Sequence, residues 1–137
     1  MIKFVIPGEP ASKKNSQNIV NAGGRQYLIQ SDLYREYEKA ALWLIPQSAR
    51  QMIDYPVNIK AIYYRSTKRR VDRTNLESAL LDVLTRAGVI ADDNRDIAAA
   101  SDGSRVYYDP ISPRTEVTIT ELEEEYEQWA KKRRERK

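Results

Sequence analysis

The strongest pattern of hydrophobic and polar positions is helical and lies in the middle of the chain. Apolar residues recur there every three or four positions: Leu76, Ala79, Leu80, Val83, Leu84 and Ala87. Gly88 follows, as is typical of the residue just past a helix end. A second helical pattern, which we expect to face the core, lies between the candidate cap Ser31 and Pro46: Leu33, Tyr37, Ala40, Ala41 and Leu44. The two patterns predict helices over about 75–87 and between residues 31 and 46.

Shorter stretches that alternate apolar and polar residues, or are rich in β-branched and aromatic ones, predict strands. They cover residues 2–6, 18–20, 26–29, 57–64, about 104–108 and about 115–120. The second and third flank Gly23-Gly24, which permits a tight hairpin turn. Val89-Ile90 is a candidate short strand after the central helix. These elements predict an α+β fold, a single small domain with a mixed or antiparallel sheet packed against two main helices.

One compact domain is the size that 137 residues allow. We place this domain at residues 1–120 and expect a charged helix or tail over 121–137. The tail is acidic first and basic last, which matches a helix dipole, and Leu122, Tyr126 and Trp129 are spaced three or four residues apart. We expect that stripe to pack on the domain or on a partner subunit.

Composition narrows the chemistry. The chain has no histidine and no cysteine, which excludes thiol nucleophiles, disulfides, the usual zinc sites and histidine acid–base catalysis. Catalysis would then use carboxylates, lysine, hydroxyls or a metal held by oxygen, and Mg²⁺ suits oxygen ligands. No stretch is apolar enough to span a membrane and the first residues lack the pattern of a signal peptide, so we expect a cytoplasmic protein.

The net charge is only +3, from 23 Lys and Arg against 20 Asp and Glu, so the distribution of charge matters more than the total. One basic run surrounds an acid: Lys68, Arg69, Arg70, Asp72 and Arg73. This run is a candidate phosphate-binding patch, although an exposed loop without function explains it about equally well. The same two interpretations hold for Lys13 and Lys14, in the polar loop after the first strand.

Asp72 stands directly before the central helix, where an aspartate commonly serves only as the N-cap. Thr74, however, is followed three residues later by Glu77, which is the spacing of a capping box. The helix would then have a cap that does not need Asp72. We therefore expect Asp72 to be available as a metal ligand.

A polar stripe runs beside the apolar one on the same helix: Asn75, Ser78, Asp82 and Thr85. Asp82 shares a face with Asn75 but lies roughly 10 Å further along the helix axis. It would ligate a metal only in a site that spreads up the helix. We favour a structural role for Asp82, as a half-buried carboxylate bonded to a basic side chain or a backbone amide.

Asp92 and Asp93 follow the central helix and a return segment that can bring the chain back towards the start of that helix. Asp-Asp-Asn is also an ordinary turn sequence that needs no function. As a site, adjacent carboxylates would collect a divalent cation, which neutralises charge that develops on a phosphate during hydrolysis. Together with arginines and lysines that hold the phosphate, this acidic pair predicts phosphodiester chemistry.

Residues 69–94 read RRVDRTNLESALLDVLTRAGVIADDN. They contain a basic run, the positions of an Asp-x-Asp-Asn motif, a Leu-Asp-x-Leu helix, an Ala-Gly pair and an Asp-Asp pair. This order resembles the signature of the RusA-type Holliday-junction resolvases. The segments Ile6-Pro7 to Lys14 and Gly24 to Tyr37 are similar to the family's N-terminal strand, loop and first helix, so the resemblance covers about residues 1–121.

The resemblance implies a small α+β homodimer that acts on branched DNA. Its activity would be paired, Mg²⁺-dependent nicking of four-way junctions during DNA recombination and repair, with Mn²⁺ as a substitute metal. By position, the resemblance implies catalytic roles for Asp72, Asn75, Asp92 and Asp93. The three aspartates would ligate the metal, and Asp93 would be the ligand nearest to it.

Two positions depart from the family's pattern. Thr74 stands where the second acid of Asp-x-Asp-Asn is expected, and Ser78 stands where a lysine is expected. A missing carboxylate weakens metal binding, and a missing lysine removes transition-state stabilisation that Arg73 or Lys68 would have to supply. A junction-binding protein that has lost cleavage is therefore a second hypothesis, and an RNA-acting nuclease is a third.

Overall fold

The computed structural model describes residues 1–13, 17–22, 25–30 and 32–122, with the backbone alone for residues 17–22, 25–30 and 32. Its main sheet joins β1 (Ile2–Pro7), β7 (Arg114–Glu121), β4 (Val57–Arg65) and β5 (Ala98–Ala100) in that order, and β6 (Arg105–Tyr108) also pairs with β4. β7 is antiparallel to β1 and β4, whereas β5 and β6 are parallel to β4. With helices α1 (Asp32–Leu44) and α2 (Arg73–Arg86), this mixed sheet confirms the predicted α+β fold.

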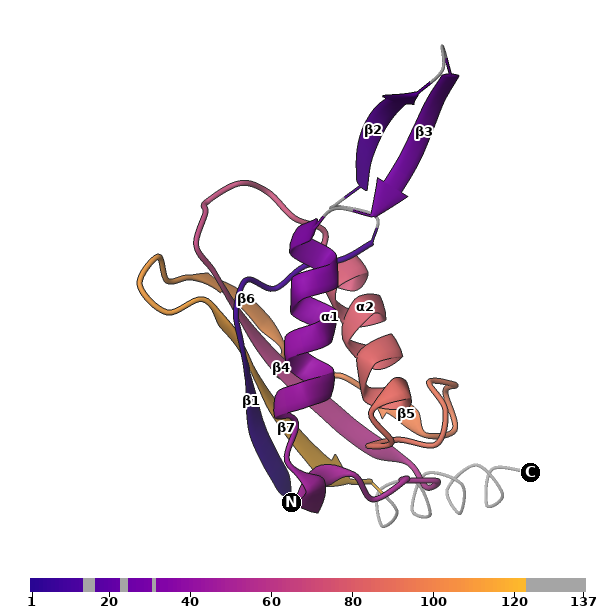
Figure 1. Ribbon diagram of the computed structural model, residues 1–137. Helices are drawn as coiled ribbons and strands as arrows, with labels where there is room; N and C mark the ends of the chain where they lie inside the picture. The colour runs from indigo at the N-terminus through magenta and orange to yellow at the C-terminus, as the bar shows by residue number, and fades with distance from the viewer. Residues whose placement is uncertain (14–16, 23–24, 31, 123–137) are drawn as a thin grey trace, which may run out of the picture.

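Both helices lie on one face of the sheet (Figure 1). Alternate strand residues point towards them and form the core: Phe4, Ile6, Ile59, Ala61, Tyr63, Val117 and Ile119. In the register, Ile59 stands opposite Ile119 and Ala61 opposite Val117. The remaining strand residues point to the other face, which no helix covers in the part of the chain that the structure describes.

The central helix agrees with its pattern. Residues Leu76, Ala79, Leu80, Val83 and Leu84 of α2 are all buried. Gly88 follows with φ of 75°, a conformation that glycine adopts at little cost and that ends the helix. The predicted helix is confirmed, and it begins two residues before the expected start at Asn75.

The apolar stripe that we predicted for α1 was partly wrong. Tyr37 and Ala41 are buried as expected, but Leu33 and Leu44 are exposed. The buried side of this helix is instead Tyr34, Tyr37, Ala41 and, just past its end, Ile45. These residues are three or four positions apart, and their two aromatic rings bury more surface than the leucines would, so the rings decide which side faces the sheet.

After α2 the chain does not form the predicted strand at Val89-Ile90. Ile90 makes a single parallel bridge with Ile53. The short strand β5 follows, which the sequence did not predict because its three alanines carry no strand pattern. A short 3₁₀ helix, Gln47–Ala49, connects α1 to the segment that contains Ile53.

The predicted hairpin is present as β2 (Gln17–Ala22) and β3 (Arg25–Gln30), a separate two-stranded sheet that projects from the domain (Figure 1). Its turn at Gly23-Gly24, and the predicted cap Ser31, lie outside the described residues. No helix in the described part of the chain is long and apolar enough to cross a membrane.

The predicted charged helix or tail was placed at residues 121–137, of which the structure describes only the first two. Glu121 is the last residue of β7, and the backbone N–H of Leu122 donates to the carbonyl of Pro56 at 3.0 Å. The sheet therefore extends one residue past the predicted domain boundary. The rest of the predicted helix, residues 123–137, lies outside the described residues.

Candidate active site

Asp72 is the N-cap of α2, contrary to our expectation. Its Oδ1 accepts hydrogen bonds from the backbone N–H of Thr74 at 3.0 Å and from the Thr74 hydroxyl at 2.6 Å. The predicted capping box fails because α2 already begins at Arg73, which puts Thr74 inside the first turn and makes its hydroxyl a donor to Asp72. Glu77 instead lies 3.9 Å from the guanidinium of Arg73. Asp72 is nevertheless exposed to solvent, so its carboxylate is both a cap and a surface group.

A hollow of about 150 Å³ lies beside the first three turns of α2. Its polar lining comes from α2 and from the loop after β1: Ser12, Lys13, Asn75, Ser78 and Asp82. The Lys13 ammonium lies 3.9 Å from the Asp82 carboxylate and 5.8 Å from the centre of the Tyr34 ring. The structure thus brings Asn75, Ser78 and Asp82 together with Lys13, which the sequence alone did not connect to them.

Asp82 has the structural partner that we favoured, a basic side chain. At 3.9 Å, and with about 40% of both side chains exposed, this ion pair contributes only on the order of 1 kcal/mol or less to stability. Lys13 nevertheless lines the same hollow as Asn75 and Ser78. A lysine from the loop after β1 therefore stands in the hollow that Ser78 lines.

A second hollow, of about 480 Å³, lies on the other side of the first turn of α2. Arg73 contributes to it from the helix, and the start of β6 and the loop before it contribute Asp102, Ser104 and Arg105 among others. Two arginines and one aspartate are thus among the residues that line this hollow. The first turn of α2 is flanked by polar hollows on both sides, and each contains at least one basic side chain.

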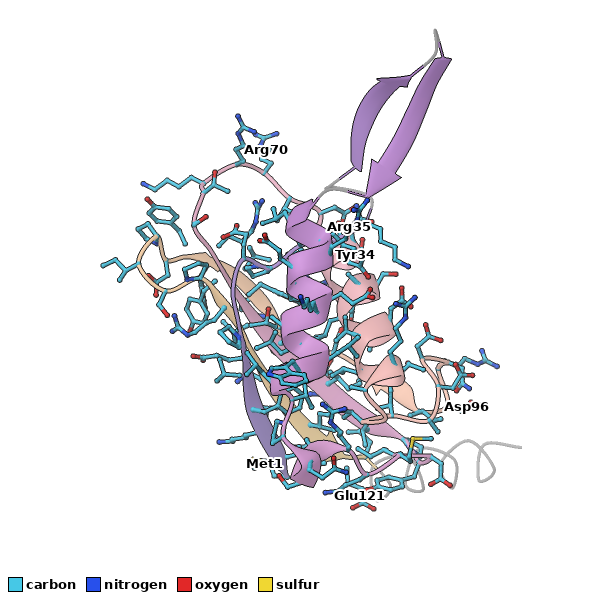
Figure 2. All side chains as sticks on the ribbon, in the orientation of Figure 1. Met1, Tyr34, Arg35, Arg70, Asp96 and Glu121 are labelled. Carbon is cyan, nitrogen blue, oxygen red and sulfur yellow. The ribbon has the colours of Figure 1, made fainter. Side chains whose placement is uncertain are left out.

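The basic run forms the loop between β4 and α2. Arg65 donates to the carbonyl of Arg69 at 2.6 Å, and Glu9 accepts from the backbone N–H of Ser66 at 3.0 Å. These bonds hold the loop from its base, while Lys68, Arg69 and Arg70 remain exposed. Figure 2 labels Arg70 on this loop. Phosphate binding by these residues stays a prediction. Lys14, the other candidate, lies outside the described residues.

Asp92 and Asp93 lie at the opposite end of α2, so the expected return to the helix start was wrong. The N–H groups of Val89 and Ile90 both donate to the carbonyl of Leu84, and Ala91 donates to Ile53, so the chain turns beside the last turn of the helix. A helix of 14 residues is about 20 Å long. Figure 2 labels Arg70, in the loop before α2, and Asp96, in the segment after it, on opposite sides of the domain.

Asp92 shows the geometry of an ordinary turn. Its carboxylate accepts from the backbone N–H of Asp93 at 2.8 Å and from the amide of Asn94 at 3.1 Å. These bonds, the first above all, lower the pKa of Asp92 below its ordinary value. Over the described residues, no three acidic side chains lie close enough together to hold a metal ion. One chain therefore does not form the three-aspartate site that we expected.

The sequence reasoning missed an aromatic group at the same end of the sheet as Asp72. Tyr107 and Tyr108 end β6, and both are about half exposed. The Lys68 ammonium lies 4.9 Å from the centre of the Tyr108 ring. Two adjacent tyrosines at the end of a predicted strand are the sequence signal that could have indicated this surface, and the pairing of β6 with β4 brings them close to the basic loop.

Two comparisons with known proteins bear on these residues. The chain matches the family model of endodeoxyribonuclease RusA over residues 7–120. The match includes Asp72, both hollows and the turn at Asp92-Asp93, and it ends before the charged tail. Among curated proteins, no match was found.

Proposed function

The chain belongs to the RusA family of endodeoxyribonucleases, which act on Holliday junctions, and we propose that it resolves four-way DNA junctions by paired, Mg²⁺-dependent nicks in recombination and repair. Mn²⁺ would replace Mg²⁺. The observation that carries this proposal is the exposed carboxylate of Asp72, which lies between a basic loop and two polar hollows. The family match favours DNA over RNA as the substrate.

The basic residues would bind the DNA backbone. Lys68, Arg69 and Arg70 extend from a braced loop beside Asp72, so they can hold phosphates on both sides of the bond to be cut. Arg73 lies in the first turn of α2, where its charge adds to the positive end of the helix dipole. Lys13 stands beside Ser78, and we assign to it the charge that the family's lysine would supply.

The carboxylates of a single chain do not fit a complete metal site, because Asp72 and the Asp92-Asp93 pair are separated by the length of α2. A homodimer would resolve this disagreement. In an interface with two-fold symmetry, if residue i contacts residue j of the partner, then j also contacts i. The Asp72 end of each chain would meet the Asp92-Asp93 end of the other, giving two equal sites for two nicks. A divalent ion held there would activate water and neutralise charge on the phosphate.

Mixed dimers test this arrangement. Asp72→Asn and Asp93→Asn chains with different affinity tags are co-expressed, and dimers that carry both tags are isolated. If the two acids come from different chains, one site of the mixed dimer is intact and the other lacks both acids. We expect each pure variant to cleave at least about a hundredfold more slowly than wild type, and the mixed dimer to nick one strand of a labelled four-way junction at a rate near that of a wild-type site.

Three other outcomes would contradict parts of the proposal. A mixed dimer without activity means that both acids act within one chain. A wild-type protein that is monomeric by light scattering excludes the shared site. A wild-type protein that binds junctions but yields no product with Mg²⁺ or Mn²⁺ removes the catalytic proposal altogether.

A junction-binding protein without cleavage is the second candidate function. The geometry of Thr74 favours it, because this residue donates a hydrogen bond to Asp72 where a second carboxylate would bind metal. This candidate predicts tight, salt-dependent binding to junctions, since phosphate contacts release counterions. Metal-dependent nicks that disappear in Asp93→Asn would exclude it.

A further inference from the structure

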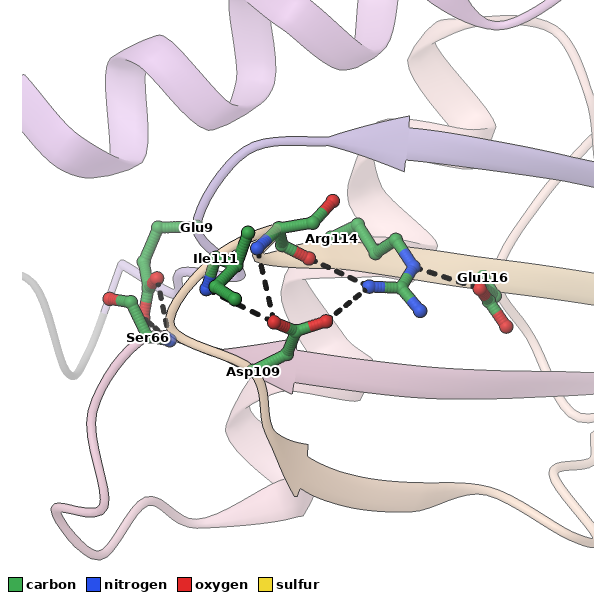
Figure 3. A network of polar contacts seen from close by, with 7 residues as sticks. Glu9, Ser66, Asp109, Ile111, Arg114 and Glu116 are labelled. Atoms are coloured by element: carbon green, nitrogen blue, oxygen red, sulfur yellow. Dashed lines mark hydrogen bonds and ion pairs between the residues drawn. The ribbon is translucent and has the colours of Figure 1, made fainter.

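The loop between β6 and β7 is held by a network around Asp109 (Figure 3). One oxygen of its carboxylate accepts from the backbone N–H of Ile111 at 3.0 Å and of Ser112 at 3.1 Å, and the other accepts from Arg114 at 2.8 Å. Arg114 also donates to the carbonyl of Ser112 and to Glu116, both at 2.8 Å. The loop is therefore closed by its own side chains.

The same loop is also attached to both neighbouring segments. The N–H of Asp109 donates to the carbonyl of Arg65 at 2.8 Å, at the start of the basic loop. The N–H of Gly8 donates to the carbonyl of Pro113 at 3.1 Å. These contacts fix the loop against the end of the sheet where β4 leads into α2.

This rigid loop displays an apolar side chain at its tip. Ile111 is 92% exposed, between Pro110 and Pro113. Single exposed apolar residues are common and need no function. Here, however, hydrogen bonds fix the backbone that presents the side chain, and most of that side chain contacts solvent. A fixed apolar tip of this kind is suited to insertion into a partner.

The surroundings of the tip identify the partner by its chemistry. Tyr107 and Tyr108 are 51% and 48% exposed and lie directly before the loop. Tyr107 packs on Tyr64 with ring centres 5.8 Å apart, and the Lys68 ammonium lies 4.9 Å from the centre of the Tyr108 ring. Aromatic rings beside cations match bases beside phosphates.

The acidic residues of this region do not oppose DNA binding. Asp109 and Glu116 are both bonded to Arg114, and Glu9 lies 3.9 Å from Arg65. The exposed charges at this end of the sheet include four basic side chains, Lys68, Arg69, Arg70 and Arg73, and one carboxylate, that of the proposed metal ligand Asp72. The charge of the surface therefore complements a polyanion.

We infer that Ile111 is a preformed wedge that enters the base stack at the branch point of a DNA junction. Apolar side chains on rigid elements unstack neighbouring bases in this way, and the cost is lower where stacking is already interrupted, as at a branch. The wedge would favour junctions over linear duplex, whereas the basic loop binds the backbone of both. This inference rests on the proposed function, because it requires that the chain binds branched DNA.

Fluorescence of 2-aminopurine tests the wedge, because this base becomes brighter when it leaves the stack. The base is placed at the branch point of a four-way junction or in the middle of a linear duplex, without divalent metal so that nothing is cut. We compare wild type, Ile111→Ser, Ile111→Leu and the control Trp43→Ser, which changes an exposed apolar residue on α1.

With wild type, Ile111→Leu and Trp43→Ser, we expect a rise in fluorescence at the branch point and little change in the duplex. With Ile111→Ser, the rise in fluorescence at the branch point should be lost. This variant should bind the junction about tenfold more weakly, which is the usual loss for one stacked side chain. Its affinity for the duplex should be unchanged. Ile111 makes no core contact, so folding should be unaffected, and melting temperatures check this.

The outcomes separate this inference from the proposed function. Wild type that fails to bind the junction overturns both. If wild type binds the junction and raises the fluorescence of the branch base, and Ile111→Ser does the same with equal affinity, the wedge alone is overturned. An Ile111→Ser variant that loses the dimer by light scattering also overturns the wedge, because Ile111 is then a contact between two copies of the chain.

Discussion

The two ends of α2 differ in charge and in what holds them in place. At the first end, Asp72 caps the helix beside a loop with three exposed basic residues that is braced by Arg65 and Glu9. At the other end, Asp92 and Asp93 form a compact acidic turn that is held by its own short hydrogen bonds. The cleavage site that we propose combines the basic loop and Asp72 with the Asp92-Asp93 pair, and in one chain these two groups lie at opposite ends of α2. In the homodimer that we propose, the second chain brings the two groups together.

The largest effect is expected from removing either acid. Asp72→Asn and Asp93→Asn should each slow Mg²⁺-dependent junction cleavage by about 10²–10³-fold, the usual loss for a group that stabilises charge in the transition state. Asparagine is also a good N-cap, so Asp72→Asn should keep the fold of α2. Single-turnover cleavage and junction binding are measured together. If Asp72→Asn cleaved junctions at the wild-type rate, the start of α2 would not be part of the active site.

Removing the charges of the basic loop tests whether this loop binds the phosphates of DNA. A Lys68→Ala, Arg69→Ala, Arg70→Ala triple variant should weaken binding to junction and linear duplex alike. The slope of log affinity against log salt should fall by about 0.9 for each phosphate contact that is lost. Lys39→Ala, an exposed lysine of α1, is the control. An unchanged slope in the triple variant would show that the loop does not contact phosphate.

A gain of function is expected at Thr74. Thr74→Asp would put a second carboxylate beside Asp72 in place of the hydroxyl that donates to it. We expect the Mg²⁺ concentration for half-maximal cleavage to fall by about tenfold, because a further charged oxygen ligand strengthens binding of a hard cation. Thr74→Ser, which keeps the hydroxyl, should resemble wild type. If Thr74→Asp needs as much Mg²⁺ as wild type for half-maximal cleavage, or more, the result would contradict a metal at this end of α2.

The smallest effect concerns stability and pH at the acidic turn. Hydrogen bonds from Asp93 and Asn94 lower the pKa of Asp92 below its ordinary value of 3.8. The ionised carboxylate therefore stabilises the fold at pH values above 3.8. As pH falls, the unfolded chain binds the proton on Asp92 before the folded chain does. The stabilisation is therefore lost as pH falls through the lowered pKa of the folded chain. In EDTA, wild type should melt slightly higher than Asp92→Ala at pH 6, and the difference should shrink towards pH 2. A difference in melting temperature that grows as pH falls would contradict the lowered pKa of Asp92.

Local patterns predicted the elements of this fold because periodicity is a property of neighbouring residues. The stripe from Leu76 to Ala87 and the alternation along β4 needed no knowledge of the rest of the chain. The start of α2 was harder to predict, because a shift of only two residues decides whether Asp72 or Thr74 caps the helix. On α1, the side that faces the sheet depended on which rings the sheet could cover, and so Leu33 and Leu44 were misplaced.

The sequence by itself determined the α+β fold, the chemistry open to a chain without histidine or cysteine, and the family. Only the tertiary structure decided which of these residues lie together. Lys13 reached Asp82 because the loop after β1 passes α2, and Asp93 stayed far from Asp72 because the chain turns beside Leu84. Contacts between distant segments depend on how the whole core packs, and no local pattern of residues encodes such a distance.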